Sequence, residues 1–210
     1  FIKSELFKQP CLGDGLLGYY DQAKIHLESE TLFIELKSLL EKRKDLWSAW
    51  SAIICQLVDT KRLDEALQYA LKSVERFPLT PGSWYDLSLV YKTKGDYEEQ
   101  IQALNRAIGI NPNWSFGIQQ LSEALCKINK KAEARDLLTD SIRKLPLDQY
   151  LYGYLADVQW QLGEKETAIE TIKKALTLDS EYEWGWQTLK NWLRETKRTE
   201  EIEQMAWQVA

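Results

Sequence analysis

The sequence predicts an all-α protein, a right-handed α-solenoid of about five to six helical hairpins. The first observation is a set of bulky apolar side chains that recur every 34 residues: Trp50, Trp84, Ile118, Tyr152 and Trp186. The second is that three of the five prolines, Pro78, Pro112 and Pro146, keep the same interval. A fixed period of this length indicates an array of one repeated supersecondary unit.

The composition is that of an ordinary folded protein, with 44% hydrophobic and 28% charged residues. The net charge of −5 argues against nucleic-acid or anionic-membrane binding, because phosphate contacts need clustered Lys and Arg. The sequence contains no apolar run of the roughly 18 residues that a membrane span requires. Cys11, Cys55 and Cys126 lack metal-type spacing, which favours a reducing compartment and a cytoplasmic location.

The first 46 residues fit the repeat less well than the rest. We expect an irregular lead-in at 1–14 and a degenerate hairpin or cap at 15–46, with helices near 15–27 and 29–43. The competing interpretation of this segment is the tail of a preceding domain. The chain begins with Phe1 and has no signal-peptide pattern, so we expect a piece of a longer protein or a processed product.

The units of the array are 47–80, 81–114, 115–148, 149–182 and a partial 183–210. In the second unit an apolar helical face that includes Trp84 and Leu87 is followed by Gly95, which supplies the backbone freedom for a turn. A second apolar stripe then runs to Asn111-Pro112, where proline stops the helix. Small residues recur where the paired helices approach closely: Ala66, Ala107, Ala134, Ala168 and Ala175. Each unit is therefore predicted to be a helical hairpin.

The unit at 81–114 resembles the tetratricopeptide repeat (TPR) family. The matching positions are Trp84, Leu87-Ser88, Tyr91, Gly95, Tyr97, Ala107 and Pro112, and the resemblance extends over residues 47–210. Departures from the family pattern are Ile54, Gln100, Gln159, Ser180 and Lys190. Two of them, Ile54 and Lys190, fall in the first and last units, where terminal repeats are expected to be atypical.

The resemblance implies that the first helix of each hairpin lines a concave groove in which ligands bind. The positions off the core stripe are Tyr85, Asp86, Leu89, Phe116, Gln119, Gln120, Glu123, Tyr150, Tyr154, Asp157, Trp160, Trp184, Gln187 and Asn191. Such a groove is aromatic, amide-rich and mildly acidic, and aromatic side chains are frequent binding hot spots. The alternative is that several of these aromatic side chains pack between adjacent hairpins.

One subtype of the family is disfavoured. TPR adaptors for chaperone tails hold a carboxylate with Lys and Asn, and no lysine stands at the corresponding places here, whereas Asp86, Glu123 and Asp157 would repel an anionic tail. A neutral, apolar or basic peptide segment is the predicted partner.

The sequence offers little for catalysis. His26 is the only histidine, which disfavours a catalytic triad and a zinc site, and the GDG at 13–15 is too short for a phosphate loop. We therefore expect no catalytic residue, no metal and no cofactor.

The leading hypothesis for function is a non-catalytic scaffold that binds a protein or peptide in its groove. A second hypothesis is a regulatory or substrate-docking segment of a larger multidomain enzyme. A third is a self-associating module, a homodimer through the C-terminal end face, because no following hairpin would cover Ile202, Met205, Trp207 and Val209.

Overall fold

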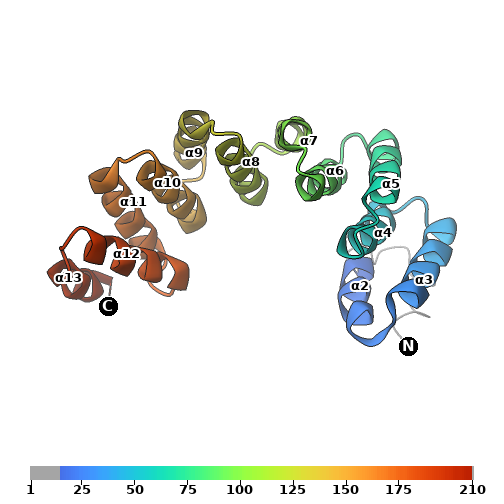
Figure 1. Ribbon diagram of the computed structural model, residues 1–210, viewed down its shortest axis with the longest axis horizontal. Helices are drawn as coiled ribbons and strands as arrows, with labels where there is room; N and C mark the ends of the chain where they lie inside the picture. Colours follow the sequence, from blue (N-terminus) through green and yellow to red (C-terminus); the bar gives the residue numbers. More distant parts are fainter. Residues whose placement is uncertain (1–14, 210) are drawn as a thin grey trace. The chain divides into compact units, whose positions relative to one another are not determined.

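The computed structural model describes residues 15–209, and every regular element in that range is an α-helix (Figure 1). The predicted lead-in at 1–14, with Cys11, lies outside the described residues. The chain divides into two compact units, Phe1–Asn111 and Pro112–Ala210. Each unit is considered by itself below.

The first unit contains three consecutive helix pairs. They are α2 (Gly15–His26) with α3 (Ser29–Lys42), α4 (Trp47–Asp59) with α5 (Leu63–Arg76), and α6 (Pro81–Lys94) with α7 (Tyr97–Ile110). The second unit repeats this arrangement. Its pairs are α8 (Ser115–Lys127) with α9 (Lys131–Lys144), α10 (Gln149–Gln161) with α11 (Lys165–Leu178), and α12 (Glu183–Glu195) with α13 (Glu200–Val209).

The turns inside the five hairpins from α4–α5 to α12–α13 each contain a residue with a left-handed backbone. At the end of α6, Gly95 adopts a φ of 85°, and the next amide, of Asp96, donates to the carbonyl of Tyr91 at 3.0 Å. This is the hydrogen-bond pattern of a helix that ends on a left-handed residue. The predicted break at Gly95 is thus confirmed, and Pro112 lies two residues beyond the end of α7, as expected.

The repeated tryptophans have a second role besides packing. The indole N–H of Trp50 donates to the Lys44 carbonyl at 3.1 Å, and that of Trp84 donates to the Pro78 carbonyl at 2.9 Å. Trp186 makes the equivalent bond to the carbonyl six residues before it, at 2.8 Å. Each indole therefore ties the loop that enters its hairpin to the first helix of that hairpin.

The small residues lie in the helix interfaces, as predicted. Ala66, Ala107, Ala134, Ala168 and Ala175 are all completely buried, which allows close approach of the paired helices. Gln100 occupies the place of Ala66 in the second repeat and is buried as well.

The helices expected near 15–27 and 29–43 are present as α2 and α3. They join the array through Tyr20, whose hydroxyl donates to Asp59 Oδ2 at 2.7 Å, and through Gln56, whose amide donates to the Ser29 carbonyl at 3.0 Å. That this pair is a degenerate repeat stays a prediction.

The apolar side chains of the last helix, α13, differ in how far the core covers them. Met205 is buried and Ile202 packs against the same core, whereas Trp207 is 83% exposed. Self-association through this face stays a prediction that depends mainly on Trp207. None of the helices in the described range combines the length and apolar character of a bilayer-crossing segment.

Candidate functional site

The predicted groove residues lie on the first helices of four hairpins. Tyr85, Asp86 and Leu89 belong to α6 in the first unit, and the remaining candidates belong to α8, α10 and α12 in the second unit. The two sets are therefore described separately.

Asp86 is a buried residue and does not line a groove. It is 2% exposed, and its carboxylate accepts hydrogen bonds from Trp47 Nε1 and Ser51 Oγ, both at 3.0 Å. The Trp47 ring lies against Gly82, where a β-carbon would collide with it, so a side chain of α4 covers this part of α6. Tyr85 and Leu89 are half-buried. Burial raises the pKa of Asp86 to about 7, although the two hydrogen bonds oppose the shift.

Two of the predicted amides are also withdrawn from the surface. Gln119 and Gln120 on α8 are buried, and the Gln119 amide donates to Ser115 Oγ at 3.0 Å within the same helix. Gln119 and Gln120 therefore expose little surface to a peptide backbone, and their place in a groove stays a prediction. A helical position away from the core stripe of one hairpin can still be covered by the neighbouring hairpin.

Tyr154 and Trp160 on α10 pack between adjacent hairpins. The Tyr154 hydroxyl donates to Glu123 Oε1 of α8 at 2.8 Å, and burial together with this carboxylate raises the pKa of the phenol. The Trp160 ring stacks on Trp192 of α12, with ring centroids 4.5 Å apart and nearly parallel planes. The alternative interpretation from sequence, packing between hairpins, therefore holds for both aromatic side chains.

Three aromatic side chains, two of them exposed, gather between the start of α10 and the start of α12. Tyr150 and Trp184 are 48% and 45% exposed, and Tyr182 lies between them, with ring centroids 5.3 Å from Tyr150 and 5.8 Å from Trp184. We call Tyr150, Tyr182 and Trp184 the aromatic cluster. Burial, with nearby Tyr150 and acidic residues, raises the pKa of Tyr182 to about 12, so the phenol is neutral at physiological pH.

Two glycines make room for the central ring of the aromatic cluster. A β-carbon on Gly153 would lie 2.5 Å from the Tyr182 hydroxyl oxygen, and one on Gly185 would lie 2.7 Å from Tyr182 Cδ1. Tyr182 precedes α12 in a loop, so helix geometry alone did not identify it. The sequence feature that could have indicated Tyr182 is a pair of glycines, Gly153 in α10 and Gly185 in α12, whose lack of a side chain leaves room for its ring.

Polar side chains border the aromatic cluster on the same helices. Gln187 and Asn191 of α12 are exposed and bonded to each other, with Gln187 Nε2 donating to Asn191 Oδ1 at 3.2 Å. Asp157 of α10 accepts from Gln161 Nε2 at 2.7 Å. Phe116 of α8 is exposed beside the Trp114 ring, with centroids 6.1 Å apart. The second unit therefore presents aromatic, amide and acidic groups on its first helices.

The described residues offer no metal site. No three of their His, Cys, Asp and Glu side chains lie close enough together to hold an ion, and His26 is exposed on α2. Cys55 and Cys126 are free thiols, and burial raises the pKa of both.

Comparison with known families agrees with the helical hairpins. Tetratricopeptide repeat models match residues 81–113 and 120–183. A comparison with curated proteins gave no match.

Among solved structures, pilF from Pseudomonas aeruginosa is similar over 99% of this chain and 90% of its own, with a TM-score of 0.69 and 15% identity. The MamA 41-end fragment from Desulfovibrio magneticus RS-1 is similar over 78% of this chain and 92% of its own, with a TM-score of 0.60 and 20% identity. YrrB, described as a TPR protein with an unusual peptide-binding site, is similar over 81% and 88%, with a TM-score of 0.57 and 15% identity. At such identities the likenesses show the fold alone.

These matches define a class, the all-α TPR solenoids. The chain contains tetratricopeptide repeats at residues 81–113 and 120–183, and its fold is that of TPR solenoids.

Proposed function

We propose that this protein is a non-catalytic scaffold that binds an extended segment of another protein over the aromatic cluster. The observation that carries the proposal is the exposure of Tyr150 and Trp184, two large rings held in place by the half-buried Tyr182. Rigid aromatic side chains give contact area at little cost in conformational entropy. Gln187 and Asn191 offer amide donors and acceptors that suit a peptide backbone.

The charge of the second unit's first helices favours a neutral, apolar or basic segment. Glu123 and Asp157 contribute carboxylates on this face, and the predicted groove positions of the unit carry no lysine. An anionic segment would meet like charges there. The description of YrrB as a TPR protein with a peptide-binding site supports the class of ligand proposed for this chain.

The test uses random peptides displayed on phage and selected on the full chain. We expect one class of selected peptides to be apolar or basic and to lose about tenfold or more of its affinity for the variant Tyr150→Ala/Trp184→Ala. The melting temperature should change little, because both rings are nearly half exposed.

Leu162→Ala/Leu178→Ala is the matched control, since it removes two exposed apolar side chains from outside the aromatic cluster. Peptides that bind the wild type and the aromatic variant equally well would refute this site. A large drop in melting temperature would show instead that the rings are chiefly structural.

A further inference from the structure

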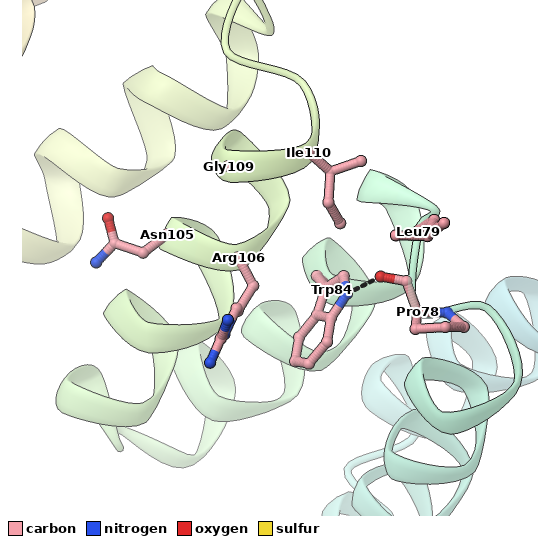
Figure 2. Close-up of a pocket in the computed structure, with 7 residues that line it drawn as sticks. All are labelled: Pro78, Leu79, Trp84, Asn105, Arg106, Gly109 and Ile110. Carbon is pink, nitrogen blue, oxygen red and sulfur yellow. Dashed lines mark hydrogen bonds between the residues drawn. The ribbon is translucent and has the colours of Figure 1, made fainter.

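A hollow of about 520 Å³ lies in the first unit, on elements that do not contribute to the aromatic cluster (Figure 2). Its lining includes Pro78 and Leu79 from the loop before α6, and Trp84 from α6 itself. Arg106, Gly109 and Ile110 contribute from α7. We call this the Trp84 hollow. Its volume falls within the range of about 300–1,000 Å³ that is usual for ligand sites in proteins.

The apolar part of the Trp84 hollow is held in a fixed geometry. The Trp84 indole N–H is already used in its bond to the Pro78 carbonyl, so the ring presents an apolar face (Figure 2). Leu79 is 81% exposed, and Ile110 points toward the Trp84 ring from above in the view of Figure 2. Fixed, exposed apolar groups of this kind gain free energy when another apolar group covers them.

Gly109 keeps the Trp84 hollow open, and packing does not require a glycine there. A β-carbon on Gly109 would have no atom within 4 Å, in contrast to Gly82, where it would collide with Trp47. Gly109 lies in the last turn of α7, where a glycine has no packing advantage over alanine and relieves no clash. The residues one and two repeats later, Arg143 and Thr177, both carry side chains that extend beyond a β-carbon.

Arg106 supplies an uncompensated positive charge at the edge of the Trp84 hollow. It is exposed, and no carboxylate within residues 15–209 pairs with it. The residue one repeat later is Asp140, which pairs with Arg143 at 2.7 Å. An arginine next to an apolar surface is well suited to a carboxylate, because its planar group can donate two parallel hydrogen bonds.

We propose that the Trp84 hollow is a second docking site, for a protein segment that presents an apolar side chain next to an Asp or Glu. The apolar side chain lies on Trp84 in the space above Gly109, and the carboxylate pairs with Arg106. This preference is opposite in charge to that of the aromatic cluster. The inference stands independently of the proposed function, since it depends on different residues in the other unit.

The test uses the same displayed peptides and three variants of the full chain. Gly109→Leu fills the hollow, Arg106→Glu reverses its charge, and Thr177→Leu makes a comparable substitution at the equivalent position of α11. We expect a class of selected peptides with Leu, Phe or Trp beside Asp or Glu. This class should lose about tenfold or more of its affinity for the first two variants and none for Thr177→Leu.

Tyr150→Ala/Trp184→Ala should leave this class unaffected, which separates the two sites. Gly109→Leu should keep its helical circular dichroism, because the space around a β-carbon at this position is open. The proposal is overturned if no acidic-apolar class is selected. It is equally overturned if such peptides bind Gly109→Leu or Arg106→Glu as tightly as the wild type.

Discussion

Five residues spaced 34 apart share a left-handed backbone. Lys61, Asn129 and Lys197 have φ near 60°, and Gly95 and Gly163 have φ near 85°. In this region a residue with a β-carbon is strained by about 1–2 kcal/mol, whereas glycine is not. The strain is reduced at Asn129, because asparagine tolerates this conformation better than lysine does. The turns at Lys61 and Lys197 are therefore the least favourable of the five.

Lys61→Gly should stabilise the protein by about 0.5–1 kcal/mol, because relief of the strain exceeds the added freedom of the unfolded chain. Urea denaturation followed by circular dichroism measures the change. Lys72→Gly, an exposed position inside α5, is the control and should destabilise by about 1 kcal/mol. A loss of stability for Lys61→Gly would mean that the lysine side chain makes a contribution larger than the strain.

The residue type alone indicates some of these left-handed turns and not others. Gly95 indicates a turn by its residue type, and so does Gly163. Lysine has no preference for a left-handed backbone, so Lys61 and Lys197 carry no local signal. Only the 34-residue register locates them, since a residue one or more whole repeats away from Gly95 must take the same backbone conformation for the hairpins to stack.

At the scale of elements, the contact between α4 and α6 includes a buried carboxylate. Asp86 of α6 accepts hydrogen bonds from Trp47 and Ser51 of α4, and half-buried Cys55 faces the same region with a pKa raised to about 12. Burial raises the Asp86 pKa from 3.8 to about 7. The folded state therefore holds the proton of Asp86 over a pH range in which the unfolded chain has lost it.

The direction in which Asp86 changes the stability of the protein with pH follows from the difference between its pKa in the folded and unfolded states. The contribution of Asp86 is fully present below pH 3.8 and is lost as the pH rises through about 7. Exposed carboxylates such as Asp64 and Glu65 have lowered pKa values and act in the opposite direction. The comparison of wild type with Asp86→Asn cancels their effect, because they are present in both proteins.

Asp86→Asn should gain stability relative to the wild type as the pH rises from 4 to 8. The amide stays neutral and can still accept a hydrogen bond, whereas the wild-type carboxyl must ionise inside the protein. Melting temperatures measured over this pH range provide the test. A constant difference between the two proteins would show that Asp86 does not titrate in this interval.

The candidate site was predicted less well than the helices, because contacts between neighbouring hairpins bury some of the predicted groove positions. Helix geometry assigns Asp86, Gln119 and Gln120 to a face away from the core of their own hairpin. It does not show that an adjacent hairpin covers that face, as Trp47 does next to Gly82. The exposed Tyr150 and Trp184 were identified, but Tyr182 was missed because it belongs to a loop.

At the scale of the whole molecule, the contacts within the chain group into two units, Phe1–Asn111 and Pro112–Ala210. In repeat proteins each hairpin contacts mainly its neighbours, so stability is approximately a sum of local terms. Unfolding need not then be all-or-none, and one part of the array can open before another.

Trp84→Ala should therefore loosen the first unit more than the second. The half-buried indole packs against the core of the first unit and holds the Pro78 carbonyl, so we expect a loss of about 3 kcal/mol, at the low end for a tryptophan truncation. Native-state hydrogen exchange should show reduced protection of amides in α4–α7 and little change in α10–α12. Trp186→Ala, which removes the equivalent anchor of the second unit, should reverse the pattern. If either variant lowers protection equally in all helices, the chain unfolds as one cooperative body and the local description is wrong.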